Sequence, residues 1–140
     1  MLKNFLKIAL LSISLITLSC SIDDDGYSFE TTQAVPILDV SAPTTMVTGK
    51  SYPLEVTLEK TTECHTFLRF DLVERNENEI YYSATTRYVD DGTCADDDPE
   101  EITEILNFEN DFEDDFVIKF FSNTNENGYT FIEVEVEVTE

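Results

Sequence analysis

From Pro36 onward the chain alternates between apolar and polar residues in short segments. The clearest segment is the last, in which aliphatic residues alternate with glutamates: Ile132, Glu133, Val134, Glu135, Val136, Glu137 and Val138. Period-two alternation places one side of a strand against a core and the other in water, as in antiparallel sheets. The pattern recurs earlier in the chain, around residues 52–59, 68–72, 80–88, 102–108 and 116–121.

Turn and breaker residues divide these segments. The pieces 37–40 and 44–48 flank Pro43 and predict a broken first strand, because proline confines a strand to a sheet edge or to a switch between sheets. Asn123–Gly128 ends in Asn-Gly, which is typical of a tight hairpin. About seven or eight short strands predict one all-β domain over residues 36–140, an antiparallel β-sandwich of immunoglobulin or fibronectin III type.

The first twenty residues follow a different pattern. Lys3 and Lys7 precede an almost entirely apolar run from Ile8 to Leu18, which ends at Ser19-Cys20. A positive segment followed by an apolar segment of this length is typical of a secretory signal peptide, and a membrane-spanning helix needs about 20 apolar residues. We therefore expect residues 1–19 to be a signal peptide.

The end of this leader resembles the lipobox of bacterial lipoproteins, in which the cysteine becomes the new N-terminus and carries a covalent lipid. Ser19 and Cys20 fit that pattern, whereas Thr17 stands where the usual pattern has leucine; relaxed versions of this kind occur in lipoproteins of the Bacteroidota. The alternative is an ordinary cleaved signal with Cys20 as an incidental thiol. Cysteine parity favours lipidation, because three cysteines leave one over when two pair.

Residues 20–35 lack either hydrophobic period and predict a tether behind the lipidated cysteine. The cluster Asp23, Asp24 and Asp25 resembles the surface-export signal of Bacteroidota lipoproteins. The alternative is a solvated acidic linker, since runs of like charge are usually extended.

The charge composition of the chain limits the classes of partner that it can bind. The chain has 8 basic and 30 acidic residues, and removal of the leader leaves six basic residues and a net charge of −24. Such a charge repels nucleic acid and anionic membrane surfaces, so we expect no nucleic-acid partner and contact with the membrane through the lipid alone. Because 41% of the residues are apolar, the chain is not a disordered polyanion.

Cys64 and Cys94 are the second informative pair. They precede and follow two strands that are neighbours in sequence, and a disulfide is the default state of such a pair in an oxidising compartment. The rival interpretation is a zinc site with the adjacent His65. Zinc is disfavoured because the paired Cys-x-x-Cys spacing is absent.

The loop from Asp90 to Glu101 carries seven carboxylates in twelve residues. Calcium takes six to eight oxygen ligands, so this loop is a candidate calcium site, with Asp90, Asp91, Asp96, Asp97 and Asp98 as ligands. The Asp-x-Asp-x-Asp-Gly order of an EF-hand is absent, and a solvated acidic loop is the favoured interpretation. We expect no cofactor apart from the covalent lipid on Cys20 and, in the calcium interpretation, the bound ion.

Catalytic motifs are missing from the sequence. The one histidine is His65, no nucleophile motif surrounds it, and the chain has no glycine-rich phosphate loop and no tryptophan. We therefore expect a protein that is not an enzyme. Tyr81, Tyr82 and Tyr88 are candidates for a binding face, although core packing explains them equally well.

The mature chain resembles small envelope lipoproteins of Bacteroidota built on one Ig-like sandwich. The resemblance rests on Cys20 with its acidic follow-on, on Cys64 and Cys94, and on the closing valine–glutamate strand. It implies a lipid-anchored outer-membrane protein but no activity. We expect a non-catalytic binding or adhesion accessory module on the extracellular face, with a protein or glycan partner. The alternatives are a structural or assembly lipoprotein facing the periplasm and a calcium-dependent module.

Overall fold

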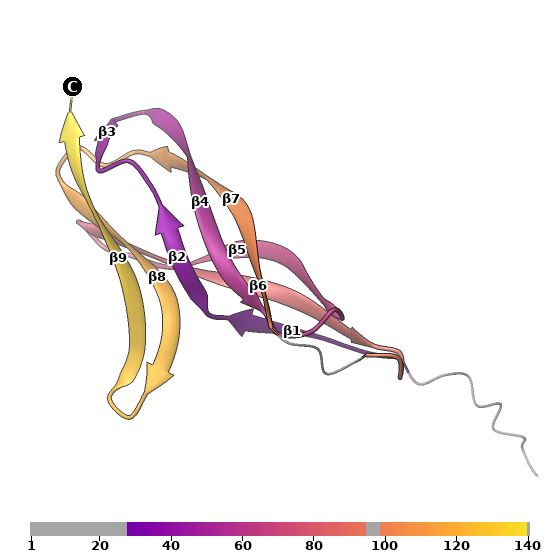
Figure 1. Ribbon diagram of the computed structural model, residues 1–140. Coiled ribbons are helices and arrows are strands. Elements are labelled where there is room, and N and C mark those ends of the chain that lie inside the picture. The colour runs from indigo at the N-terminus through magenta and orange to yellow at the C-terminus, as the bar shows by residue number, and fades with distance from the viewer. Residues whose placement is uncertain (1–27, 95–98, 140) are drawn as a thin grey trace, which may run out of the picture.

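The computed structural model describes residues 28–94 and 99–139 (Figure 1). Those residues form nine strands and no helix: β1 Phe29–Val35, β2 Ile37–Ser41, β3 Thr45–Val47, β4 Lys50–Lys60, β5 His65–Arg75, β6 Glu79–Asp90, β7 Glu100–Asn110, β8 Phe116–Asn125 and β9 Gly128–Thr139. The strands form two packed sheets, which confirms the predicted all-β sandwich. The strand beyond the expected eight is β1.

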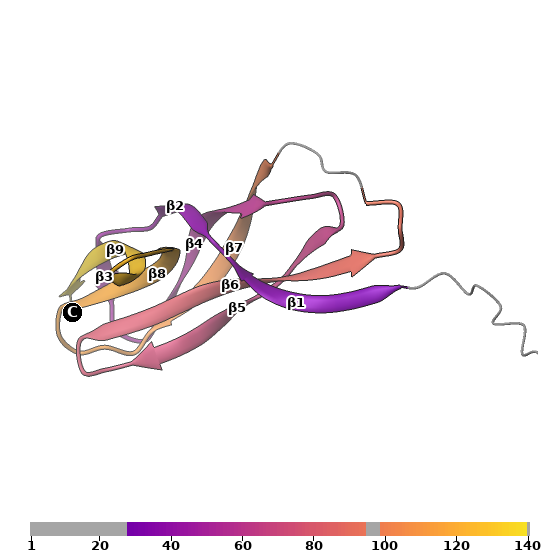
Figure 2. The ribbon, with the colours of Figure 1, turned by 90° about the horizontal axis from the view of Figure 1, so that it is seen from below.

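The larger sheet has six strands and the smaller has three, with β4 between β2 and β7. β6 organises the larger sheet, because β5 pairs along one of its sides while β8 and β1 share the other (Figure 2). β9 pairs with β8, and β3 lies beyond β9. The β6–β8 and β3–β9 pairings are parallel and the other pairings between the described strands are antiparallel, so the predicted antiparallel arrangement holds with these two exceptions.

The core lies between the two sheets and contains the residues that the alternation placed inward. Leu54, Val56 and Leu58 of β4 are fully buried from the smaller sheet. Ile118 and Phe120 of β8 are fully buried from the larger sheet. Removing such side chains from water supplies most of the stabilisation of a domain of this size.

The predicted break at Pro43 is confirmed. β2 pairs with β4 in the smaller sheet, whereas β3 pairs with β9 of the larger sheet. Pro43 lies between the two strands, at the point where the chain crosses from one sheet to the other. Proline suits this crossing because it has no backbone N–H to leave unpaired.

The predicted tether extends too far along the chain. Residues 29–35 form β1, and all seven pair with β6, from Phe29 opposite Asp90 to Val35 opposite Ala84. The sequence did not predict this strand because Val35 is its one buried residue, so β1 shows no alternation of apolar and polar positions. Backbone hydrogen bonds hold β1 instead, together with a two-pronged contact in which the Arg87 guanidinium donates to both carboxylate oxygens of Glu30 at 2.8 Å.

β5 departs from the predicted alternation at two β-bulges, one between Phe67 and Arg69 and one between Leu72 and Glu74. A bulge inserts a residue that has no partner and shifts the register beyond it. Leu68, predicted to point inward, is therefore 42% exposed, and Phe67 packs against the core instead. The second bulge leaves Val73 65% exposed.

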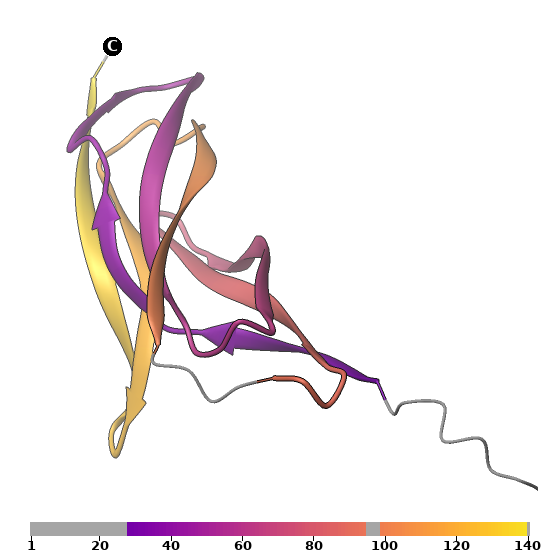
Figure 3. The same cartoon turned by 45° about the vertical axis from the view of Figure 1, so that its right-hand side comes forward.

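The predicted hairpin joins β8 to β9. Its turn consists of Glu126 and Asn127, and Asn125 Oδ1 accepts a hydrogen bond of 2.8 Å from the backbone N–H of Asn127. Gly128 follows with a φ of 122°, in the region that side chains disfavour. The hairpin tip projects away from the rest of the larger sheet (Figure 3).

Candidate functional site

The residues proposed for anchoring and export are all N-terminal. Cys20 and Asp23–Asp25 lie outside the described residues, as does the boundary after the signal peptide at residue 19. Lipidation and surface export therefore stay predictions. The described chain begins just before β1, whose first residue pairs with the last residue of β6.

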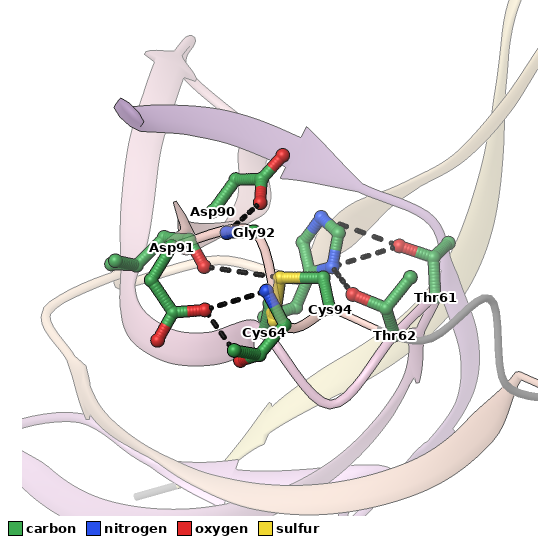
Figure 4. Close-up of a disulfide and its surroundings, with 10 residues drawn as sticks. Thr61, Thr62, Cys64, Asp90, Asp91, Gly92 and Cys94 are labelled. Carbon is green, nitrogen blue, oxygen red and sulfur yellow. Dashed lines mark hydrogen bonds between the residues drawn. A yellow bond between two sulfur atoms is a disulfide. The ribbon is translucent and has the colours of Figure 1, made fainter. Parts of the chain in front are cut away.

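Cys64 and Cys94 form a disulfide, as predicted, with 5.9 Å between their Cα atoms (Figure 4). Cys64 lies in the turn just before β5, and Cys94 follows the end of β6. The carbonyl oxygen of Cys64 also accepts a 3.2 Å hydrogen bond from the backbone N–H of Val89. The disulfide therefore closes one end of the β5–β6 pair and uses both sulfurs that a zinc site would need.

The acidic loop is described at its two ends, residues 90–94 and 99–101. Asp90 Oδ1 accepts a hydrogen bond of 2.8 Å from the Gly92 N–H, and Asp91 Oδ1 accepts bonds from the backbone and hydroxyl of Thr93. The Thr93 hydroxyl bond lowers the pKa of Asp91. These carboxylates are occupied by local turn contacts, and no group of three His, Cys, Asp or Glu side chains that could hold a metal occurs within residues 28–94 and 99–139. Calcium binding stays a prediction because Asp96, Asp97 and Asp98 lie outside those residues.

His65 is a buried structural residue beside the disulfide. Its side chain is 6% exposed and contacts the amide of Gln33 and the hydroxyls of Thr61 and Thr62, the last at 2.9 Å from Nδ1. Its ring centroid lies 4.7 Å from that of Tyr88. These contacts tie together β1, β5, β6 and the turn that holds Cys64. Burial, with a smaller contribution from the charge of Lys60, lowers the pKa of His65.

We expect the imidazole of His65 to titrate below its ordinary pKa of about 6.5 in the folded protein. At a pH below about 6.5 the unfolded chain therefore binds a proton more readily than the folded chain does. The contribution of the neutral His65 to the free energy of unfolding is complete above about pH 6.5 and decreases as the pH falls below that value. NMR titration of this single histidine, at an ionic strength that screens the surface carboxylates, measures the pKa directly. Lys60→Gln should raise it slightly, and a wild-type midpoint at or above 6.5 would contradict the expectation.

One of two grooves in the described chain lies on the outer face of the larger sheet and has mostly apolar walls. It has a volume of about 380 Å³ and is lined by residues of β1, β5, β6, β8 and β9. We call it the aromatic groove and define it by six residues: Val73, Tyr81, Ser83, Phe121, Tyr129 and Phe131. Pockets of this size with mostly apolar walls and a few polar groups are typical of ligand sites.

The topology of the larger sheet produces this groove. β8 pairs with β6 only as far as Phe120, and from Ala84 onward β1 takes its place beside β6. β8 then continues past the contact with β6 as part of the projecting hairpin (Figures 1 and 3). The groove lies at this fork, where Ala34 of β1 and Phe121 of β8 line opposite branches.

Aromatic rings form the walls of the groove in two nearly perpendicular pairs. Tyr81 and Phe131 have centroids 5.4 Å apart and planes 83° apart, and Phe121 and Tyr129 have centroids 5.7 Å apart and planes 74° apart. Tyr129 is 72% exposed, the highest value among the exposed large hydrophobic residues. Edge-to-face pairs are favourable in themselves, but a tyrosine this exposed gains little from burial. Its position is explained better by a binding role than by packing.

Charged side chains lie on the outer face of the larger sheet next to these rings. Lys119 Nζ lies 2.8 Å from a Glu79 oxygen and 3.3 Å from a Glu133 oxygen, and 5.5 Å from the centre of the Tyr81 ring. Tyr81 donates a 2.6 Å hydrogen bond to Glu79. The hydrogen bond from Lys119 lowers the pKa of Glu79, and the bond to Glu79 raises the pKa of Tyr81. Glu74 also lines the groove, so carboxylates outnumber cations here.

A second groove, of about 500 Å³, lies at the other end of β8 and β9 and is lined partly by Thr44, Asn78, Asp115 and Glu137. Asp115 Oδ1 there accepts a 2.9 Å hydrogen bond from the backbone N–H of Val138. This contact gives Asp115 a structural role at the end of β9. The second groove lacks the ring pairs of the first and is the weaker candidate.

The structure separates the three tyrosines that the sequence offered as a binding face. Tyr81 and Tyr82 both line the aromatic groove, but the Tyr82 ring packs on the core, with its centroid 5.9 Å from that of Phe120. Tyr88 lies elsewhere, against His65. Sequence reasoning missed the contributions of Tyr129 and Phe131. The available signal was their position on the polar side of β9, where the next three outward residues are glutamates.

Within the part of the chain that the structure describes, no helix is long and apolar enough to cross a bilayer. Comparison of the chain with protein-family models, with curated proteins and with solved structures finds no match.

Proposed function

We propose that this protein is a non-catalytic, lipid-anchored binding module of the bacterial cell envelope, displayed on the outer surface. The aromatic groove is the observation that carries the binding role. Its exposed rings and its position at the fork between β1 and β8 are what a ligand site on a sandwich requires. One fold supports many functions, so the groove and not the sandwich supports the binding role.

The placement of β1 supports the anchored arrangement. The predicted anchor at Cys20 precedes the first residue of β1, Phe29, and the groove lies near the last residues of β1, at Ala34. A seven-residue strand spans about 20 Å, so the groove is separated from the predicted anchor by the length of β1 in addition to the preceding linker. A site at this position is accessible to partners when the chain is held at a membrane.

Site-directed photo-crosslinking in intact cells tests the binding role. A benzophenone amino acid replaces Tyr129 in the groove or, as the matched control, Ile105, which is 49% exposed on the smaller sheet. We expect a discrete adduct from position 129 that disappears when Phe131→Ser is added, and none from position 105. Benzophenone reacts with protein and glycan C–H bonds alike. No adduct at 129, or the same adducts from both positions, contradicts the proposal.

Replacing Cys20 with alanine is expected to move the protein from the membrane fraction to the soluble fraction. The reason is that a covalent lipid supplies the membrane affinity, about 0.8 kcal/mol for each buried methylene, and this acidic chain offers no basic surface in its place. Fractionation followed by immunoblotting measures the change. Cys64→Ala with Cys94→Ala is the matched control and should remain with the membrane, and unchanged retention of the Cys20 variant would refute lipidation.

Changing Asp23, Asp24 and Asp25 together to alanine is expected to move the protein from the outer surface to the periplasmic face. Protease added to intact cells should degrade the wild type and leave the triple variant intact. A second triple variant provides a control with equal loss of charge elsewhere in the chain: it changes Glu133, Glu135 and Glu137 to alanine. Equal protection of wild type and triple variant would favour the structural lipoprotein facing the periplasm.

A further inference from the structure

Four of the six residues that define the aromatic groove are aromatic. Within each of their two pairs the ring planes are nearly perpendicular, at 83° and 74°, so the rings are not all oriented in one direction. The face of an aromatic ring carries negative electrostatic potential, and cations bind to it, most strongly where several rings surround the charge. The concentration of aromatic rings along this groove is therefore compatible with an organic cation as ligand.

The charge around the groove selects for the same ligand. Glu74 lines it, and Glu79 and Glu133 outnumber the one lysine that lies between them. The mature chain as a whole has 30 acidic residues. This net negative charge repels anionic ligands at a distance and raises the local concentration of cationic ones.

Lys119 already demonstrates the contact that a ligand would make. Its ammonium lies 5.5 Å from the centre of the Tyr81 ring while two carboxylates hold it at 2.8 and 3.3 Å. A second ring and a second carboxylate also line the groove: Tyr129 is 72% exposed, and Glu74 of β5 lies opposite Tyr81 of β6 in the sheet. Those positions offer a second cation the environment that Lys119 has.

We propose that the aromatic groove binds the guanidinium or ammonium side chains of a positively charged, extended segment of a partner protein. This proposal rests on the binding role proposed above and specifies the ligand of that site. Arginine fits best, because its planar guanidinium stacks on aromatic rings and donates to a carboxylate at the same time. The occupant is a protein segment because the groove is open at the surface and its acidic surroundings extend well beyond one side chain.

NMR titration of the oxidised mature chain carrying Cys20→Ala tests this. The probe is the peptide Gly-Ser-Arg-Gly-Arg-Ser-Gly with blocked ends, and its control has both arginines replaced by citrulline, which keeps the shape and removes the charge. Tyr129→Leu with Phe131→Leu removes ring faces but keeps apolar side chains. Phe29→Leu is the matched variant, because Phe29 is 59% exposed at the far end of β1.

We expect the arginine peptide to shift amides around the groove and the citrulline peptide to leave them unchanged. The double leucine variant should bind about tenfold more weakly, and Phe29→Leu should bind like the wild type. Shifts spread over the whole acidic surface, with equal binding by all variants, would mean non-specific attraction and overturn the proposal. Maltohexaose is titrated as well, as an uncharged glycan probe. If it binds in the groove and the arginine peptide does not, the proposed ligand is wrong while the binding role is upheld. If no probe shifts the groove amides, the proposal fails, and photo-crosslinking at Tyr129 then judges the binding role separately.

Discussion

Replacing Phe120 with alanine is expected to lower the free energy of unfolding by about 3–5 kcal/mol, the range for a large aromatic residue removed from a core. Phe120 is completely buried, lies in the middle of the larger sheet, and stacks on Tyr82 with 5.9 Å between centroids. It also pairs with Ile132 of β9, so the cavity would be bounded by strands that cannot move together without losing their register. Incomplete collapse of such a site places the cost at the upper end of the range.

Urea denaturation followed by circular dichroism measures this effect, through the midpoint and the slope of the transition. Phe29→Ala is the matched control because it deletes the same atoms from a ring that is 59% exposed. It should change the free energy of unfolding by less than about 1 kcal/mol, as surface substitutions usually do. Similar losses in the two variants would show that the core is not centred on Phe120.

Alternation in the sequence was sufficient to predict the strands that carry the core. In β9, Val136 is buried where the pattern placed it, and in β4 the inward positions Leu54, Val56 and Leu58 are completely buried. The break at Pro43 was predictable because the chemistry of proline is local. Each of these features depends on residues that are neighbours in the chain.

Features that depend on distant partners were not predictable. β1 shows no alternation because its pairing with β6 supplies most of its stability, and the bulge next to Leu68 depends on the register with β6. The aromatic groove combines residues from five strands, and its shape depends on where β8 parts from β6. Single-sequence patterns contain no information on which strand lies beside which, so the sequence did not single out Tyr129.

The acidic composition influences the surface more than the fold. The three arginine ion pairs of the described chain, Arg69–Asp71, Arg75–Asp111 and Arg87–Glu30, are all substantially exposed. Exposed pairs contribute about 0–1 kcal/mol each, so they do not offset the repulsion among the remaining carboxylates. Arg75 gains more than an ion pair, because its guanidinium also lies 4.3 Å from the centre of the Phe112 ring. Stability must come from the core and from covalent constraint.

The disulfide is that constraint. Cys64 and Cys94 are 30 residues apart, and closing a loop of this length removes conformational entropy from the unfolded chain worth about 3.5 kcal/mol. The bond also fixes the end of β6 that pairs with the first residues of β1, where Val89 lies opposite Glu30. In a lipid-anchored protein, any pull on the tether would reach the domain at this end.

Cys64→Ala with Cys94→Ala is therefore expected to lower the free energy of unfolding by about 3.5 kcal/mol and the melting temperature by 10 °C or more. The comparison is made in a Cys20→Ala background, so that no third thiol exchanges with the pair. Reduction of the parent protein should reproduce the loss, which separates the effect of the bond from that of the two side chains. Hydrogen exchange adds a local readout: the amides of β1 should lose protection before those of β4, which lies in the other sheet. A loss below about 1 kcal/mol would mean that strain in the bond or structure in the unfolded chain cancels the entropic gain.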